Sequence, residues 1–414
     1  MGKYYSDEVE LALKYVFYEE RLGKGKEGMA LLEKASAAGD GDASCLLARC
    51  FWGPQYIWPG HRFPEDDKRG KSLIRLSIKQ GSALGVLCAL RARLLTPALE
   101  RDMPFESLED AYHVVLEKAE AGDAFSQYTL GNMYFWWDFV RVFGKGREAF
   151  PSQEAYNEYL KENILKCEHW FKRSFEGGMW VAGSNLRNFY MNGEEGLIPP
   201  RPELAEGITE HGAEMGYPVQ QRYLAERLKE GGDKEGAFKW FKLASENGEI
   251  DAWFSLGECY ETGEGTQKDV RKAVEWYEKR LSVGMDIRCC NSLGCLLYEG
   301  TDGVEIDYGR AFQLLLYAWN DGNTWGADCL GRMYFYGRGV QQDYIKAREV
   351  LEKVDYNNKE VRYCLGCIYA QGLGVAEDIP KGVEYLQKAG NFAPAKEELL
   401  KYKKTLFGKW VRRK

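Results

Sequence analysis

The chain has 414 residues, of which 45% are hydrophobic and 29% charged, so it can bury an extensive core and is not a disordered polypeptide. Its formal net charge of -7 argues against a general phosphate-binding surface, and we therefore expect no nucleic acid among its partners. Only 4 histidines are present, which disfavours a histidine-rich metal site. The 46 glycines exceed the usual proportion, and they and the 14% of aromatic residues need a structural explanation.

The N-terminal segment predicts a helix over residues 7–21. Acidic residues from Asp7 onward leave no apolar run of the kind that a secretory signal needs. No later stretch reaches the roughly 18 apolar residues that cross a membrane. We therefore expect a cytoplasmic protein without membrane insertion, and its 11 cysteines to be reduced, buried thiols.

Up to residue 235 a weak pattern of paired helices recurs, interrupted by long connections at residues 52–67, 96–110, 136–156 and 193–203. Insertions on one edge of a repeat protein often form its binding face. In the third connection Trp137, Arg141 and Phe143 make the segment too apolar for an idle loop. Either it folds back over the repeats as a lid, or it presents an anchor to a partner.

From residue 236 to 390 the pattern becomes regular. A Leu-Gly pair recurs with its glycine at spacings of 37, 37 and 35 residues, at Gly257, Gly294, Gly331 and Gly366. A small or apolar residue precedes each pair, an aromatic residue or leucine follows, and two further glycines come next. An aspartate then recurs in phase, as Asp269, Asp307, Asp343 and Asp378.

Each regular unit predicts two antiparallel helices. In the first helix Ala252, Leu256 and Tyr260 share one apolar stripe at helical spacing. A glycine within a helix costs about 1 kcal/mol relative to alanine, so the recurrence of Gly257 indicates that another helix approaches closely there.

The second half of each unit follows from turn and cap chemistry. Gly263 and Gly265 supply the positive φ that ends the first helix, and Asp269 is placed to cap the second. A single hairpin of this kind cannot bury both apolar faces, so neighbouring hairpins must stack. We count about ten helix pairs in the chain.

The pattern A-x-x-x-L-G-x-x-Y-x-x-G-x-G-V-x-x-D-x-x-K-A resembles the Sel-one-like repeat (SLR) family, a relative of the tetratricopeptide repeats. The resemblance implies an all-α, right-handed solenoid of about ten stacked helix-turn-helix repeats. It further implies a protein- or peptide-binding adaptor or scaffold, and it brings no catalytic residues. We divide the chain into irregular repeats (1–235), regular repeats (236–390) and a basic C-terminal capping helix (391–414).

The binding surface is expected where otherwise matching repeats differ. Positions -3, +1 and +5 from the Leu-Gly glycine lie opposite the apolar stripe of the first helix, and first helices line the concave groove of such arrays. Because aromatic residues and arginine are typical binding anchors, we predict partner contacts in this groove. The alternative is that these positions are merely solvated. The predicted groove residues are Tyr128, Trp136, Phe254, Glu258, Asn291, Asp328, Arg332, Tyr336 and Tyr363.

The sequence motifs that would indicate cofactor or metal binding are weak. Gly23-x-Gly25-x-x-Gly28 spells a dinucleotide motif, but a helix rather than a strand precedes it, and we interpret it as a turn. Cys364 and Cys367 spell C-x-x-C without the second pair that a zinc site needs. We therefore expect no catalytic residues, no cofactor, no metal and no enzymatic activity.

Two alternatives stay open. The protein could be a regulatory subunit that controls a partner enzyme, or an enzyme whose site lies in the 136–160 insertion. The C-terminal tail from residue 395 holds eight Lys/Arg against two Glu. This tail is either a solvated cap for the last repeat or a contact to an acidic membrane or nucleic acid.

Overall fold

The computed structural model describes residues 4–18, 24–53, 61, 63–354 and 358–413. The chain forms two compact units, unit 1 (Met1–Ala252) and unit 2 (Trp253–Lys414). The predicted boundary after residue 235 marks where the repeat spacing becomes regular, and it does not coincide with this division into units.

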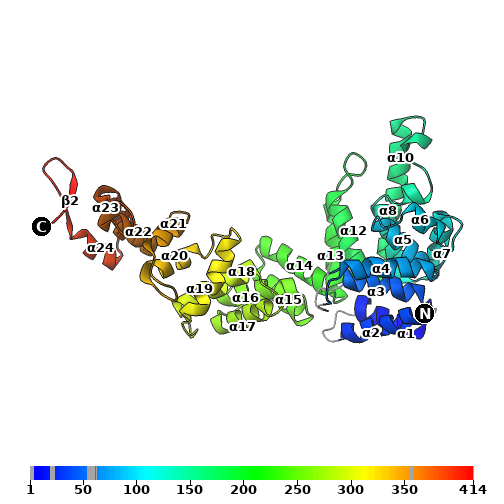
Figure 1. Cartoon of the computed structure of the whole chain (residues 1–414), viewed down its shortest axis with the longest axis horizontal. Coiled ribbons are helices and arrows are strands. Elements are labelled where there is room, and N and C mark those ends of the chain that lie inside the picture. The colour runs from blue at the N-terminus through cyan, green and yellow to red at the C-terminus, as the bar shows by residue number, and fades with distance from the viewer. Residues whose placement is uncertain (1–3, 19–23, 54–60, 62, 355–357, 414) are drawn as a thin grey trace. The chain divides into compact units, whose positions relative to one another are not determined.

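Unit 1 is built from helix hairpins (Figure 1). Its first helices are α1 (Asp7–Leu13, continued by the π-helical turn η1, Lys14–Tyr18), α3 (Gly41–Phe51), α5 (Ala83–Arg91), α8 (Ala124–Phe135), α12 (Trp180–Asn192) and α14 (Pro218–Glu230). Its second helices are α2 (Lys24–Ala37), α4 (Asp67–Lys79), α7 (Leu108–Ala121), α11 (Lys166–Glu176), α13 (Pro202–Glu214) and α15 (Lys234–Glu246). The insertions add α6 (Pro97–Arg101), α9 (Phe139–Val142), the 3-10 turn η3 (Arg147–Ala149) and α10 (Gln153–Ile164).

Unit 2 repeats the same hairpin. Helix α16 (Ile250–Thr262) begins at the division between the units, and the later first helices are α18 (Ile287–Glu299), α20 (Ala327–Tyr336) and α22 (Lys359–Gln371). The second helices are α17 (Val270–Leu281), α19 (Tyr308–Asn320), α21 (Tyr344–Leu351) and α23 (Ile379–Lys388). With those of unit 1, the described residues form ten hairpins, which confirms the predicted all-α repeat fold.

The Leu-Gly glycines lie where two helices of a hairpin meet. A Cβ added to Gly331 on α20 would come within 2.4 Å of the Leu351 Cδ2 on α21, and one added to Gly366 would come within 2.6 Å of the Leu386 Cγ. No real Cβ atom tolerates such contacts, so only glycine allows this spacing. The prediction of a close helix approach at these positions is confirmed.

Caps and turns also agree with the sequence. The Asp343 carboxylate accepts a hydrogen bond from the Lys346 backbone N–H (3.0 Å), and Asp378 does the same for Lys381 (3.0 Å). Gly337, which ends α20, has a φ of +69°, in the left-handed region that favours glycine. In these two hairpins of unit 2, residues of the hairpin itself therefore mark where the helices begin and end.

Two predictions need correction. The capping helix is present as α24 (Ala393–Leu399), but it has only 7 residues. The chain continues as an antiparallel hairpin of β1 (Tyr402–Lys404) and β2 (Trp410–Arg412), whose turn contains Gly408 at a φ of +79°. Gly25 and Gly28 lie inside α2 and not in a turn, whereas Gly23 lies outside the described residues.

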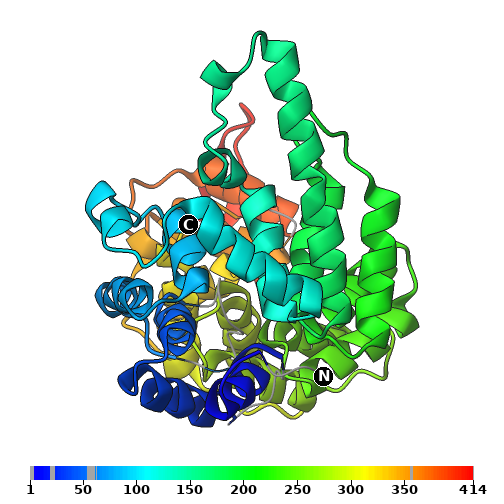
Figure 2. The ribbon, with the colours of Figure 1, turned by 90° about the vertical axis from the view of Figure 1, so that its right-hand side faces the viewer.

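The two views of the ribbon show how α10 belongs to unit 1. In Figure 1 and in Figure 2, α10 rises from the same side of the unit as α12, away from α1 and α2.

Among the helices that the structure describes, none combines the length and the apolar character needed to cross a bilayer.

Candidate functional site

The insertion after α8 folds back onto unit 1. Phe139 is fully buried, and the Phe143 ring meets the edge of Tyr112 at a centroid distance of 5.1 Å. The Arg141 guanidinium donates to the Glu100 carboxylate at 2.6 Å. This part of the segment therefore packs over the repeats, and its contact with a partner stays a prediction.

Beside this insertion lies a cavity of about 250 Å³. Four first helices line it: α3 through Arg49, α5 through Cys88, α8 through Tyr128 and α12 through Asn185. Trp136, the residue after α8, completes the lining. Two of the predicted groove residues, Tyr128 and Trp136, thus lie at one hollow formed by consecutive repeats.

Trp136 is the accessible aromatic residue of this cavity. Its side chain is 51% exposed, although the Arg91 guanidinium lies 4.3 Å from its ring and the Phe135 ring lies edge-on at 4.9 Å. Tyr128 is buried. Trp137, with a φ of +64°, is half-buried, so within this pair only Trp136 offers a large apolar surface to solvent.

An acidic group lies at the mouth of the same cavity. Burial raises the pKa of Asp138 to about 6, and the charges of Arg91, Arg93 and Arg141 only partly oppose this effect. The Asp138 Oδ2 lies 4.0 Å from the Arg91 Nη1, too far for a hydrogen bond. The ionised form of Asp138, which lies with Trp136 in the cavity lining, is consequently disfavoured near neutral pH.

A buried cation and a thiol form the floor of the cavity. Arg49 is buried, and its guanidinium lies 4.9 Å from the Phe125 ring. A hydrogen bond from the Cys45 thiol and the positive charge of Arg49 hold the pKa of Cys88 below its usual range, against the effect of burial. Neither Arg49 nor Asp138 was singled out from the sequence, because their proximity depends on residues in different repeats.

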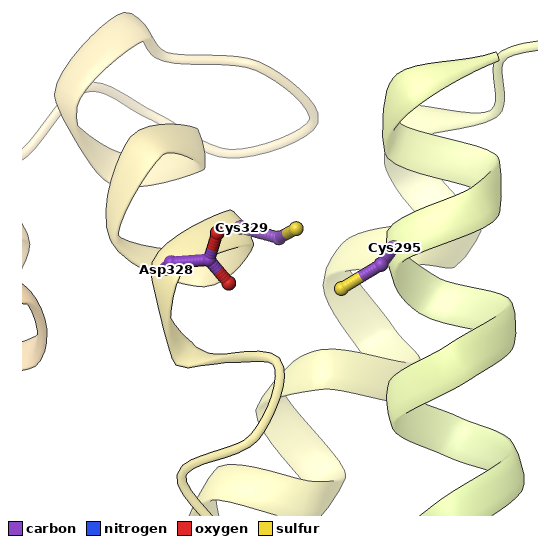
Figure 3. Close-up of side chains that lie close together, drawn as sticks. All are labelled: Cys295, Asp328 and Cys329. Atoms are coloured by element: carbon purple, nitrogen blue, oxygen red, sulfur yellow. The ribbon is translucent and has the colours of Figure 1, made fainter. Parts of the chain in front are cut away.

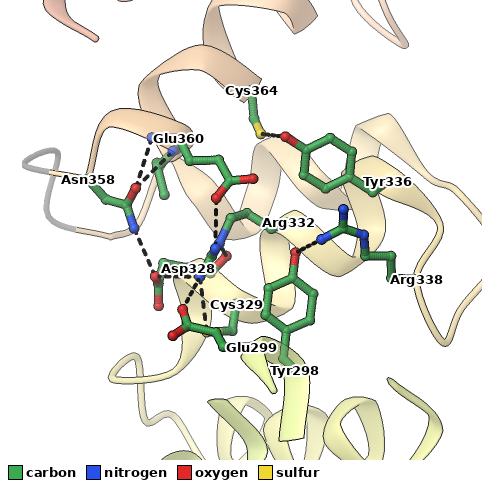
Figure 4. Close-up of polar contacts among 11 residues, drawn as sticks. Tyr298, Glu299, Asp328, Cys329, Arg332, Tyr336, Arg338, Asn358, Glu360 and Cys364 are labelled. Carbon is green, nitrogen blue, oxygen red and sulfur yellow. Dashed lines mark hydrogen bonds and ion pairs between the residues drawn. The ribbon is translucent and has the colours of Figure 1, made fainter. Parts of the chain in front are cut away.

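In unit 2 the predicted groove residues are engaged with one another. Arg332 is 7% exposed, and its guanidinium forms ion pairs with Glu360 (2.8 Å), Glu299 (3.2 Å) and Asp328 (3.3 Å) (Figure 4). These carboxylates come from α18, α20 and α22. Arg332 therefore holds three consecutive first helices together, and its role in partner binding stays a prediction.

The two predicted tyrosines lie beyond this cluster. Tyr336 is half-buried, with its hydroxyl 3.9 Å from the Cys364 Sγ (Figure 4). Tyr363 is also half-buried, and its ring meets Phe392 at 5.5 Å. Both contact the protein and retain some exposed surface.

The remaining predicted residues are also partly or wholly covered. The amide of Asn291, which is buried, donates to Asn323 at 2.9 Å. Phe254 is half-buried and stacks on Tyr277 at 5.6 Å, and Glu258 is half-buried on the same helix. The predicted stripe therefore exists as a face of the first helices, but much of it joins neighbouring repeats.

One constellation of unit 2 was not foreseen from the sequence. Cys295 on α18 faces Asp328 and Cys329 on α20, and the two sulfurs and a carboxylate oxygen lie within 4.8 Å of one another (Figure 3). Cys295 is at position +1 of one repeat and Cys329 at position -2 of the next. Without the structure, nothing indicated that these positions meet.

The solved structures that this chain resembles include two repeat proteins. A protective antigen of uropathogenic Escherichia coli strains that displays an SLR fold is 22% identical over 94% of this chain and 78% of the antigen, with a TM-score of 0.49. A Sel1 repeat protein from Oxalobacter formigenes is 22% identical over 90% of this chain and 89% of that protein, with a TM-score of 0.42.

Comparison with curated sequences finds a more local likeness. The protein DAP3-binding cell death enhancer 1 of Rattus norvegicus is 31% identical over 90 residues, which are 21% of this chain and 18% of the rat protein. The Mus musculus protein of the same name matches to the same extent. The chain thus spans about a fifth of the length of these relatives.

A family model described as the Sel1 repeat matches residues 157–179, 221–249, 251–279, 287–323, 330–353 and 362–391. Four of these six segments contain the hairpins whose Leu-Gly glycines allow the close helix contacts described above. Between residues 157 and 391 the chain therefore contains six segments that match the Sel1 repeat.

Proposed function

We propose that the protein is a non-enzymatic scaffold that binds a protein or peptide at the first-helix cavity of unit 1. Sel1 repeat proteins generally act as scaffolds for protein interactions. The name of the rat relative describes a protein that binds DAP3, which supports a binding function but does not identify the partner of this chain.

The observation that carries the proposal is Trp136. A tryptophan that is 51% exposed, backed by Arg91 and adjacent to a cavity of about 250 Å³, combines the residue types and the concave shape that binding anchors require. A partner side chain in the cavity would cover the exposed face of Trp136 and gain most of its affinity there.

The compartment and the partner class belong to the same proposal. We place the protein in a reducing compartment, the cytoplasm, and its 11 free cysteines support this placement. A net charge of -7 favours a peptide over nucleic acid as the ligand.

The test uses a displayed library of random peptides selected on the full-length protein. Peptides that bind the cavity should lose at least about tenfold in affinity for Trp136→Ala, as expected for an interface hot spot. Trp325→Ala is the matched control, because Trp325 is 86% exposed and lies in unit 2. The proposal fails if the selected peptides bind Trp136→Ala as tightly as the wild type, or if Trp325→Ala reduces binding equally.

A further inference from the structure

We propose that Cys295, Cys329 and Asp328 bind a zinc ion between helices α18 and α20 of unit 2. Their donor atoms, two sulfurs and one carboxylate oxygen, lie within 4.8 Å of one another (Figure 3). This site is separate from the peptide-binding cavity proposed for unit 1.

The geometry is close to that of a tetrahedral zinc site. Zinc–sulfur bonds of about 2.3 Å and zinc–oxygen bonds of about 2.0–2.2 Å place neighbouring donor atoms roughly 3.5–3.8 Å apart. The three donor atoms, within 4.8 Å of one another, would have to approach by up to about 1 Å to reach these separations, and Cys295 and Asp328 are only half-buried. Three protein ligands leave a fourth position for water.

The ligand types select the metal. Thiolates are soft donors that favour zinc over magnesium or calcium, which prefer oxygen ligands alone. Cys295 and Asp328 are partly exposed, so an ion can enter from solvent, whereas the buried Cys329 fixes the inner side of the site. As each metal–sulfur bond forms, the corresponding thiol releases its proton to solvent, and the charge of the site is unchanged.

The charge around the three ligands favours a dication. Glu299, Asp328 and Glu360 surround the single positive charge of Arg332, at 3.2, 3.3 and 2.8 Å respectively. Apart from the ligand Asp328, two carboxylates against one guanidinium leave a surplus of one negative charge beside the thiols. The ion pairs to Glu299 and Glu360 also offset the repulsion between Arg332 and an incoming cation.

Arg332 donates hydrogen bonds to two of the three ligands. Its Nη2 lies 3.3 Å from the Cys329 Sγ and 3.3 Å from the Asp328 Oδ2 (Figure 4). An N–H donor to a metal-bound thiolate orients the sulfur and stabilises its charge. With Oδ2 engaged by Arg332, the other carboxylate oxygen of Asp328 remains for the metal.

The experiment titrates the full-length protein, reduced with a phosphine and stripped of metal, with Co²⁺ as the probe. We expect one Co²⁺ per chain, with a thiolate-to-cobalt charge-transfer band in the near ultraviolet and the visible bands of tetrahedral cobalt. Added Zn²⁺ should displace the cobalt and abolish both sets of bands. Absence of the charge-transfer band would overturn the proposal.

Variants locate the site. In Cys295→Ser the charge-transfer band should disappear or fall to half its intensity, and Co²⁺ should bind at least about tenfold more weakly. In Asp328→Asn the affinity for Co²⁺ should also fall at least about tenfold. Cys367→Ser is the matched control, because Cys367 occupies the same +1 position of a later repeat and should bind as the wild type does. Circular dichroism verifies that each variant is folded.

The result of this titration is independent of peptide binding. Equal Co²⁺ affinity in Cys295→Ser and the wild type, or equal loss in Cys367→Ser, overturns the zinc site and leaves the unit 1 cavity untouched. Conversely, a failure of Trp136→Ala to affect peptides has no bearing on the metal titration, since no partner is present in it.

Discussion

Arg332 shows how a residue at a predicted groove position can join neighbouring repeats of the array. A variable position on the exposed face of a first helix predicted an anchor for a ligand. In the structure its guanidinium contacts carboxylates of the preceding and following first helices, Glu299 and Glu360. The identity of the residue was informative, but its contacts lie about 30 residues away in sequence and could not be read from its own repeat.

Replacing Arg332 by methionine should lower the free energy of unfolding by about 1–3 kcal/mol, because three carboxylates lose their shared counter-charge. The lower end of the range applies where these carboxylates are reached by water; Glu299 is 47% exposed. Arg332→Lys, which keeps the charge without the fork of donors, should lose less. Urea unfolding measures both, and an unchanged midpoint in Arg332→Met would contradict the expectation.

Asp138 gives a prediction with a pH dependence of defined sign. Its pKa is raised to about 6 in the folded chain, from near 4 in the unfolded chain, so the folded state binds the proton more tightly. Stability therefore rises as pH falls from about 6 to about 4, and above pH 6 the ionised group destabilises the fold.

Asp138→Asn should raise the free energy of unfolding at pH 7 by about 1–3 kcal/mol and should remove this part of the pH dependence. The difference between the unfolding free energies of variant and wild type, measured at pH 4, 6 and 7.5, isolates the contribution of Asp138 from that of other carboxylates. A difference that stays constant with pH would contradict the assignment.

Within a helix hairpin, one glycine allows the two helices to approach closely. Gly331→Ala gains about 1 kcal/mol of helix propensity, but its Cβ would collide with Leu351. We expect a net destabilisation of about 1–3 kcal/mol from overpacking. Gly207 in α13 is the control: a Cβ there meets nothing within 4 Å, so Gly207→Ala should stabilise by about 0.5–1 kcal/mol. Thermal unfolding of the two variants should shift in opposite directions.

Elements were predictable wherever local chemistry decides them. The aspartate caps, the positive-φ glycines and the 37-residue spacing each depend on residues within one hairpin, and the structure has all three. The C-terminal hairpin was missed because the high proportion of lysine in the tail suits a helix as well as an exposed strand. Its register, which pairs Tyr402 with Arg412, is a contact between segments that composition does not reveal.

For the whole molecule, the candidate sites were the least predictable feature. The cavity of unit 1 requires side chains from four different repeats, and the cysteine cluster of unit 2 requires two. Repeat spacing identified a face of the first helices to which Tyr128 and Trp136, two residues of the cavity lining, belong. It could not distinguish residues that join repeats from residues that remain accessible, because both occur at variable positions.

The 11 free cysteines allow a test over the whole chain. At neutral pH a small alkylating reagent should modify Cys88 before the other buried thiols, because the hydrogen bond from Cys45 and the charge of Arg49 lower its pKa and it lines the cavity. Cys295, although more exposed, should react more slowly because a hydrogen bond with Cys329 and burial raise its pKa. Peptide mapping should find the remaining thiols unmodified until denaturant is added. Early modification of Cys50 or Cys364, both buried, would contradict this order.

The C-terminal strand pair has a consequence for the stacking of the repeats. Tyr402 is buried with its hydroxyl 3.4 Å from the Ala370 carbonyl, and Arg412 forms an ion pair with Glu377 at 2.8 Å, so the strands occupy the side of the last repeat where another repeat would dock. A stack of identical hairpins has no intrinsic stopping point, and two such ends can join head to tail into a filament. The strand pair, which carries exposed lysines, covers this surface and so hinders the docking of a further hairpin there.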